Sequence, residues 1–162
     1  MTGSSQTAIQ WQCLAFDDLD NHQLYQVLKL RQAVFIVEQN CIYNDLDDLD
    51  QPAWHILAHR DGELLATLRC IPPGLSYPEA SMGRIAVSNE ARGLKLGRQI
   101  VERGIRCCQE QWPGSGIRIG AQNYLEKFYQ DFGFVTASDV YDEDGIPHIK
   151  MLLESPRGEV SR

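Results

Sequence analysis

The sequence lacks an apolar run as long as the roughly 20 residues that a membrane-spanning helix needs. Its opening segment, MTGSSQTAIQ, has neither the positive charge nor the apolar stretch of a secretory signal peptide. We therefore expect a cytoplasmic protein that does not act on membranes.

An excess of positive charge is also lacking, since the net charge is −7 and the pI is about 5.0. Nucleic acid is bound through its phosphates, which need a basic protein face. We therefore expect no nucleic-acid partner, and the overall acidity weakly favours a cationic substrate.

The sequence has no cysteine pair with C-x-x-C spacing, and its cysteine count of five is odd. We expect reduced and mostly buried thiols, with Cys41, in a polar loop, as a candidate for the wall of a pocket. No metal site is expected either. His55 and His59 would lie about 13 Å apart on a strand, and the acidic segment 45–50 lacks the glycine and glutamate of a calcium loop.

The 162 residues fit one domain, 1–162, with frayed ends at 1–8 and 154–162. Asp20 and Gln23 have the spacing of a capping box at the start of the first helix. The elements expected from periodicity and turn residues are strands at 9–14, 54–60, 63–71, 82–87, 117–121, 134–138 and 148–154, and helices at 20–37, 93–111 and 125–132. This order predicts an α/β protein with α+β layers, in which an antiparallel meander leads into a strand–helix–strand unit.

The segment RGLKLGRQI, 92–100, joins an expected strand to an expected helix. Free N–H groups at a helix start, two glycines and three basic side chains are the features of a phosphate cradle. A flexible loop with a solvated basic helix start explains this segment equally well. Other phosphate motifs fit poorly, because Gly97 is not followed by the Lys and Ser/Thr of a Walker loop and G-x-G-x-x-G is absent.

Two motifs together resemble those of the GNAT acetyltransferase superfamily: R-G-x-x-x-G at 92–97 after a strand, and FYQDFGF at 128–134. RQAVFIVEQNC at 31–41 and YDEDGIPHI at 141–149 further resemble the ElaA-like branch, and the resemblance extends from Ile9 to Met151. It implies a GNAT acyltransferase fold, with a mixed, mostly antiparallel central sheet of about seven strands flanked by helices.

The resemblance also implies acetyl-CoA as co-substrate, with the pyrophosphate on the backbone of 94–98 and the pantetheine arm along 85–87. The cofactor-binding residues that it implies are Ile85, Ala86, Val87, Arg92, Gly93, Leu94, Lys95, Leu96, Gly97, Arg98, Gln122, Leu125 and Tyr129. Lys95 stands where the family usually has glycine, which is tolerable if its φ is negative. Gln122 stands where many members have asparagine, and it keeps the amide chemistry.

Tyr129 takes the position of the family's general acid, where a phenol can protonate the departing thiolate. Its structural alternative is to fill the space between helix and sheet. The base candidates are Glu38, His55 and His148, and the substrate-pocket candidates are these three together with Cys41. Glu38 follows the apolar run VFIV, so we expect it to be half-buried with a raised pKa, or else at a solvated helix end. For His55 a structural role is favoured.

Two further features concern charge. The segment DLDDLD, 45–50, is either a solvated acidic loop or an acidic lip that attracts a cationic amine. Arg31, on the apolar side of the first helix, is expected to make a buried ion pair or backbone contacts.

The function expected is transfer of an acetyl group to a small-molecule or peptide amine, by direct attack in a ternary complex. A covalent route needs a cysteine or serine with its own base, and no cysteine has an evident partner in the sequence. The alternatives are another acyl thioester donor, such as acyl-homoserine-lactone synthases use on this fold, or a catalytically silent acyl-CoA sensor. The sequence leaves the oligomeric state open, and the resemblance implies a homodimer as one of the possibilities, because the family often forms dimers.

Overall fold

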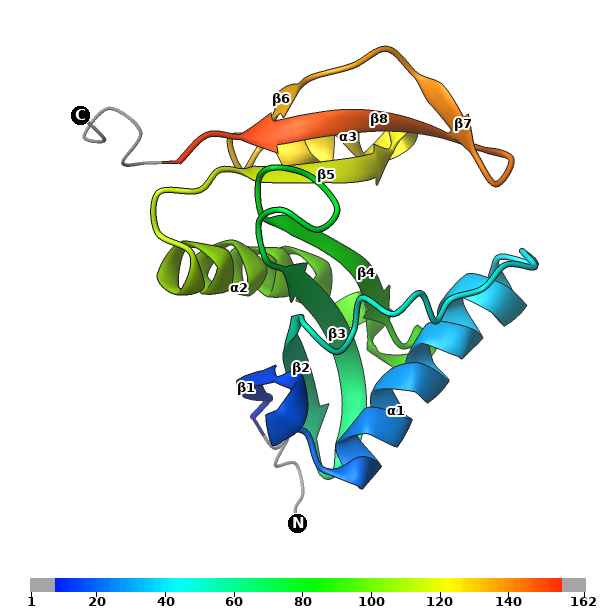
Figure 1. Ribbon diagram of the computed structural model, residues 1–162. Helices are drawn as coiled ribbons and strands as arrows, with labels where there is room; N and C mark the ends of the chain where they lie inside the picture. Colours follow the sequence, from blue (N-terminus) through cyan, green and yellow to red (C-terminus); the bar gives the residue numbers. More distant parts are fainter. Residues whose placement is uncertain (1–7, 156–162) are drawn as a thin grey trace.

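The computed structural model describes residues 8–155, and within them the chain forms two antiparallel sheets with three α-helices (Figure 1). The strands are β1 (Gln10–Ala15), β2 (Trp54–Arg60), β3 (Glu63–Ile71), β4 (Ser81–Val87), β5 (Ile117–Gln122), β6 (Val135–Thr136), β7 (Tyr141–Glu143) and β8 (Ile146–Leu153). The helices are α1 (Asn21–Arg31), α2 (Leu96–Gln111) and α3 (Glu126–Gln130). No helix in the described part is long and apolar enough to cross a membrane.

The single central sheet expected from the sequence is instead two sheets, which separate from each other between strands β4 and β5. The first sheet has the order β1-β2-β3-β4, and the second has the order β5-β8-β6, with β7 also paired to β8. A parallel bridge between Ala80 and Ile117 joins the two sheets where β4 and β5 begin. Beyond it the register of β4 against β3 shifts, because Arg84 and Ile85 both lie opposite Leu68. Such a bulge bends and twists a strand, so the divergence of β4 from β5 follows from it.

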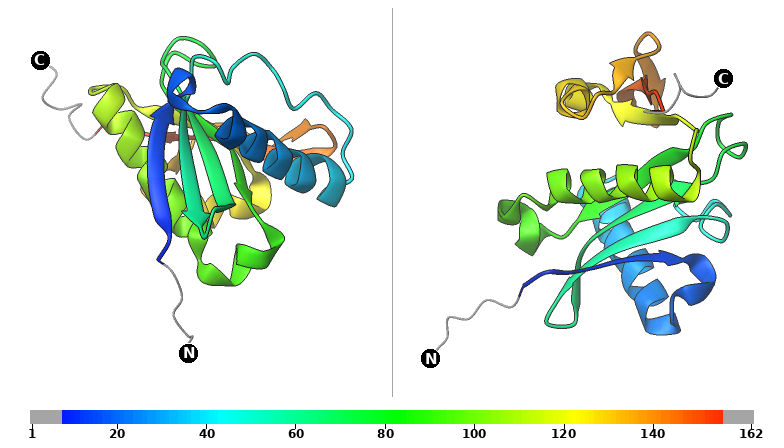
Figure 2. Two further views of the ribbon diagram at one scale, coloured as in Figure 1. Left: turned by 90° about the horizontal axis from the view of Figure 1, so that it is seen from below. Right: turned by 90° about the vertical axis from the view of Figure 1, so that its left-hand side faces the viewer.

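Helices α1 and α2 cover opposite faces of the first sheet (Figure 2). The buried residues of α2 recur at helical spacing and pack on the sheet: Leu96, Ile100, Val101, Gly104, Cys107 and Cys108. Gly104 allows the closest approach, since a Cβ there would lie 2.8 Å from Met82 Sδ and 2.9 Å from Leu68 Cδ2. The long amphipathic helix expected from the sequence therefore anchors the sheet next to the divergence.

The capping box at the start of α1 is confirmed. The Asp20 carboxylate accepts a 2.7 Å hydrogen bond from the Gln23 N–H, and the Gln23 amide oxygen accepts one of 2.9 Å from the Asp20 N–H. The helical conformation extends to Glu38, close to the predicted end at about 37. Its final part, Gln32–Glu38, is however a π-helix, a wider form that is frequent at functional sites.

Several expected boundaries differ from the structure, and β7 was not expected as a strand. Helix α2 begins at Leu96 rather than 93, because a 3-10 helix (Asn89–Leu94) and a left-handed residue, Lys95, precede it. The expected strand 134–138 pairs only over β6, and β8 begins at Ile146 rather than 148. The frayed ends expected at 1–8 and 154–162 lie outside the described residues, except for 8, 154 and 155.

Candidate active site

A cavity of about 490 Å³ lies where β4 and β5 diverge. Its wall combines β4, β5, the first turns of α2, helix α3, the π-helix and the β7–β8 hairpin. The predicted site residues in this wall are Cys41, Ile85, Gly97, Gln122, Leu125, Tyr129 and His148. The predicted residues that lie outside it are Glu38, His55, Ala86, Val87, Arg92, Gly93, Leu94, Lys95, Leu96 and Arg98.

The predicted phosphate loop joins the end of β4 to the start of α2. Gly93 and Gly97 face open space, since a Cβ on either would meet no heavy atom within 4 Å. The first N–H groups of a helix lack partners within the helix and form its positive end. A group with negative charge can therefore approach the backbone closely at this point.

Lys95, which immediately precedes α2, has φ 59° and ψ 32°. The condition of a negative φ, under which a side chain is tolerated here without strain, is not met, because the chain turns from the 3-10 helix into α2 through a left-handed residue. A side chain in this region costs about 1 kcal/mol or more, whereas glycine adopts it freely. This geometry accounts for the glycine that is usual in the family at this position.

Arg92 and Glu38 form a bidentate ion pair across 54 residues of sequence. The two guanidinium nitrogens lie 2.5 and 2.6 Å from the two carboxylate oxygens, and Arg92 also donates to the Val87 carbonyl. The hydrogen bonds from Arg92 lower the pKa of Glu38. The half-buried Glu38 with a raised pKa is therefore a wrong expectation, since the group is exposed and its guanidinium partner stabilises the ionised form.

Tyr129 lies on α3 and is 7% exposed. Its ring makes edge-on contacts with Phe128, at 5.0 Å between centroids, and Phe134, at 5.8 Å. Burial, with a smaller contribution from Tyr124, raises the pKa of the phenol to about 12. Because no residue of 8–155 hydrogen-bonds its hydroxyl, Tyr129 presents a protonated phenol in the cavity wall.

His148 lies on β8 opposite Gln122 of β5, and both line the cavity. Its Nδ1 is 2.8 Å from the carbonyl oxygen of Ile146. A carbonyl only accepts, so this contact assigns the proton to Nδ1 and leaves Nε2 with a lone pair. A neutral His148 in this tautomer can accept a proton from a bound group.

His55 lies away from the cavity, which corrects its assignment to the substrate pocket. The residue is 1% exposed, and its Nε2 is 2.9 Å from the Asp50 carbonyl oxygen. Burial lowers the pKa of this imidazole, against the opposing effect of Asp50. His55 therefore has the structural role that the sequence favoured: it is buried in β2 and contacts the backbone of Asp50.

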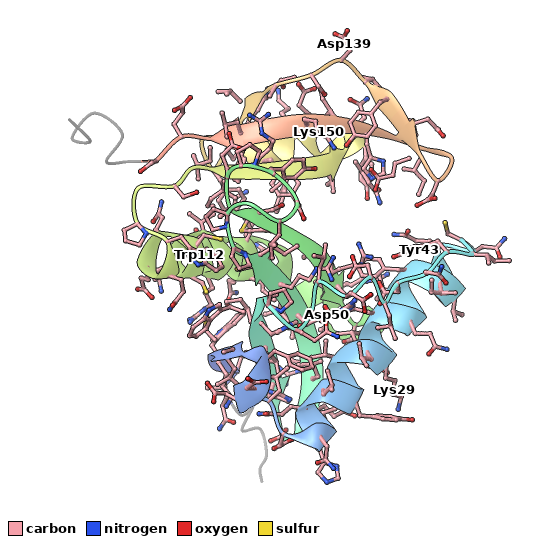
Figure 3. The ribbon with its side chains drawn as sticks, in the orientation of Figure 1. Lys29, Tyr43, Asp50, Trp112, Asp139 and Lys150 are labelled. Atoms are coloured by element: carbon pink, nitrogen blue, oxygen red, sulfur yellow. The ribbon has the colours of Figure 1, made fainter. Side chains whose placement is uncertain are left out.

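The acidic segment 45–50 turns most of its charge into the protein, and of its four aspartates only Asp48 is exposed. Three of its aspartates point inward to three arginines on different elements (Figure 3 labels Asp50). The pairs are Arg31 with Asp45 (2.9 Å) and Asp50 (2.7 Å), Arg69 with Asp47 (2.6 Å) and Asp50 (3.0 Å), and Arg84 with Asp45 (2.7 Å) and Asp47 (3.2 Å). The buried ion pair expected for Arg31 is thus confirmed, and the three charges of each sign cancel.

Arg84 lines the cavity, and no pattern in the sequence predicts this position for it. It forms part of the β4 bulge with φ 49°, a left-handed conformation that nothing in the sequence indicates for an arginine. Asp45 and Asp47 hold its guanidinium, which lies 5.5 Å from the centre of the Tyr43 ring. The acidic segment therefore fastens the bend that opens the cavity.

The aromatic part of the wall was not expected from the sequence. It consists of Phe35, Tyr43, Tyr77, Tyr124 and Phe128, which come from four separate segments of the chain. The helical spacing of Phe35 indicates a buried face, but no local pattern indicates which aromatic residues meet across the fold. In the described part, no group of three or more His, Cys, Asp or Glu side chains is placed to hold a metal.

Comparison with known proteins agrees with this architecture. Residues 19–155 match the family described as "Acetyltransferase (GNAT) domain". Protein ElaA of Escherichia coli K12 is 43% identical over 148 residues, which is 90% of this chain and 97% of ElaA. The crystal structure of E. coli ElaA superposes with a TM-score of 0.85 at 42% identity, covering 91% of this chain and 100% of that one.

A second solved structure, an acyl-CoA N-acyltransferase from Pseudomonas aeruginosa, has a TM-score of 0.87 and 39% identity. The match covers 90% of this chain and 99% of that one. The family match, the relatives and the fold agree with one another. The chain belongs to the GNAT family of acetyltransferases, and within it to the ElaA-like branch.

Proposed function

We propose that this protein transfers an acetyl group from acetyl-CoA to an amine by direct attack in a ternary complex. The observation that carries this proposal is the open glycine loop before α2 at the divergence of β4 and β5, with the protonated Tyr129 in the cavity between them. Acetyl-CoA brings an acetyl group activated as a thioester.

The residues present fit such a co-substrate. In this proposal the N–H groups of 94–98 hold the pyrophosphate. Arg92 and Arg98 lie beside them, and each is paired with a carboxylate, that of Glu38 and that of Asp131. We assign the pantetheine arm to the edge of β4 at 85–87, which has no strand beside it because β4 pairs with β5 only through the Ala80–Ile117 bridge. The Val87 carbonyl at the end of this edge accepts hydrogen bonds from Arg92. Gln122 and Leu125 line the cavity opposite this edge.

Tyr129 is the proposed general acid. Its pKa of about 12 keeps the phenol protonated at neutral pH, so it holds a proton for the sulfur that departs as thiolate. His148 is the proposed base, through the free Nε2 that its contact with Ile146 leaves. Glu38 is not assigned this role, because both of its carboxylate oxygens are bound by Arg92.

The part of the cavity near Glu143 and Asp144 is the proposed site of the acceptor, and its lining fits an amine with an apolar or aromatic body. The charges of Arg69 and Arg84 in the wall are cancelled by aspartates, whereas the wall carboxylates of Glu143 and Asp144 have no cationic partner among residues 8–155. Free carboxylates near aromatic rings attract a cationic amine.

Calorimetric titration with acetyl-CoA, with NAD and ATP as controls, tests the cofactor assignment. The variant Gly97→Glu places a carboxylate in the open space before α2, so we expect binding to be lost. Lys29→Glu, on the exposed side of α1, is the matched control and should bind normally. Acetyl-CoA binding that survives Gly97→Glu would contradict the phosphate loop.

A donor and amine panel then separates the alternatives. Turnover with acetyl-CoA that exceeds turnover with longer acyl thioesters supports acetyl transfer, and the reverse order supports another acyl donor. Binding without turnover of any donor, in wild type and in Tyr129→Phe alike, would indicate an acyl-CoA sensor.

A further inference from the structure

A thiol pair lies on the side of the molecule where β1 runs beside α2 (Figure 2). Cys13 is on the edge strand β1 and Cys107 is on the buried face of α2, and their sulfur atoms are 2.9 Å apart across 94 residues of sequence. All cysteines of the described chain are free. Three of the five are buried, as the sequence led us to expect, whereas Cys13 is exposed.

Solvent reaches this pair. Cys13 is exposed, and both thiols line a second cavity of about 310 Å³ that also includes Trp11, Arg103, Arg106 and Glu110. No residue of its wall belongs to the wall of the first cavity. A small oxidant can therefore reach the sulfurs without entering the candidate active site.

The geometry also favours reaction of one thiol with the other. A disulfide has a sulfur–sulfur distance of about 2.05 Å, so the two atoms need to approach by only about 0.9 Å. The hydrogen bond from Cys13 lowers the pKa of Cys107, with help from Cys70 and against the effect of burial, and the same contact raises the pKa of Cys13. The contact therefore favours the thiolate on Cys107, which is the reactive form of a thiol.

We propose that Cys13 and Cys107 are an oxidation site, at which a peroxide forms an intramolecular disulfide between β1 and α2. The thiolate attacks a peroxide oxygen: an S–O bond forms, the O–O bond breaks, and the leaving hydroxide takes a proton to become water. The second cysteine attacks the sulfenic sulfur: the S–S bond forms, the S–O bond breaks, and a second water leaves. Two thiols are oxidised and one peroxide is reduced.

The disulfide closes a long loop and ties the edge strand to the main helix. Closing a loop of this length restricts the unfolded chain strongly, so the oxidised protein should resist unfolding better than the reduced one. This site is independent of the proposed transferase function, because neither sulfur contacts the first cavity.

The test treats the purified full chain with one equivalent of hydrogen peroxide, followed by intact mass and non-reducing peptide mapping. We expect a loss of two hydrogen atoms, a peptide that links Cys13 to Cys107, and a melting temperature higher by about 5 °C or more that falls again with dithiothreitol. Cys13→Ser, at an exposed position that should fold normally, abolishes all three. Cys41→Ser, in the other cavity, is the matched control and retains them.

Three outcomes would overturn the proposal. They are a wild-type protein that forms no disulfide, a disulfide that persists in Cys13→Ser, and a linkage between two molecules rather than within one.

Discussion

Tyr129 combines two properties that a surface tyrosine does not have together. Its ring is fixed by Phe128 and Phe134, and burial keeps its hydroxyl protonated far above neutral pH. A side chain held in this way supplies a proton at one place without rearrangement. The residue alone, read in the sequence, is equally compatible with a filler between helix and sheet.

Replacement of Tyr129 by phenylalanine removes only the hydroxyl and keeps the packing. We expect kcat to fall about 100-fold or more, as for loss of a general acid, with little change in acetyl-CoA affinity. Steady-state kinetics and calorimetry measure the two quantities. Tyr25→Phe, at an exposed site on α1, is the control, and an unchanged kcat in Tyr129→Phe would remove the phenol from the mechanism.

The proposed role of His148 as a base depends on one atom, its Nε2. In His148→Asn the side chain keeps a polar group but loses the basic nitrogen, so we expect kcat/KM for the amine to fall by about 100-fold. His59→Asn, which instead loses a contact with Gln26 outside the cavity, should retain activity. Equal activities of the two variants would show that another group, or water, accepts the proton.

At the scale of elements, the junction between β4 and α2 carries backbone strain. Lys95 is left-handed where the 3-10 helix ends, and Arg84 is left-handed in the bulge of β4. The Arg84 side chain is held by Asp45 and Asp47, whereas no such contact holds Lys95 among the described residues. The bend at Lys95 is therefore the less supported of the two bends.

Lys95→Gly tests this strain. We expect an increase in the free energy of unfolding of about 0.5–1 kcal/mol, because glycine adopts positive φ freely. Lys29→Gly, in the interior of α1, is the same substitution at helical φ and should destabilise by about 1 kcal/mol. Urea denaturation measures both variants. Changes of the same sign in both would show that Lys95 is not strained.

At the scale of the whole molecule, three aspartates of one segment join α1, β3 and β4 through arginines. Burial opposes ionisation of Asp47, but hydrogen bonds and attraction from Arg69 outweigh it and lower its pKa to about 2. The pKa of Asp50 is lowered by Arg31 and Arg69 in the same way, also against its burial. These ion pairs hold a segment that has no helix or strand of its own.

This network predicts a loss of stability in acid. The folded state binds the Asp47 proton less tightly than the unfolded chain, in which the pKa is about 3.8. The contribution of Asp47 to the free energy of unfolding is therefore present above about pH 4 and is lost as the pH falls towards about 2. Urea denaturation between these pH values measures the slope, which should be shallower in Asp47→Asn. An equal slope in that variant would contradict the assignment.

The sequence by itself determined the order of the elements apart from β7, the capping box of α1, the glycine-containing loop before α2 and the position of Tyr129 on a short helix. Each of these follows from a local pattern: hydrophobic periodicity, turn residues, or a motif within one segment. Such patterns involve only residues close together in the sequence, so they can be recognised without knowledge of the rest of the fold.

Tertiary structure decided what meets across the fold. Glu38 binds Arg92 over 54 residues, Asp45 binds Arg84 over 39, and Cys13 contacts Cys107 over 94. It also divided the sheet at β4, turned the aspartates inward and gave Lys95 a positive φ. No local pattern records these contacts, because each results from packing two segments that the chain brings together only when it folds.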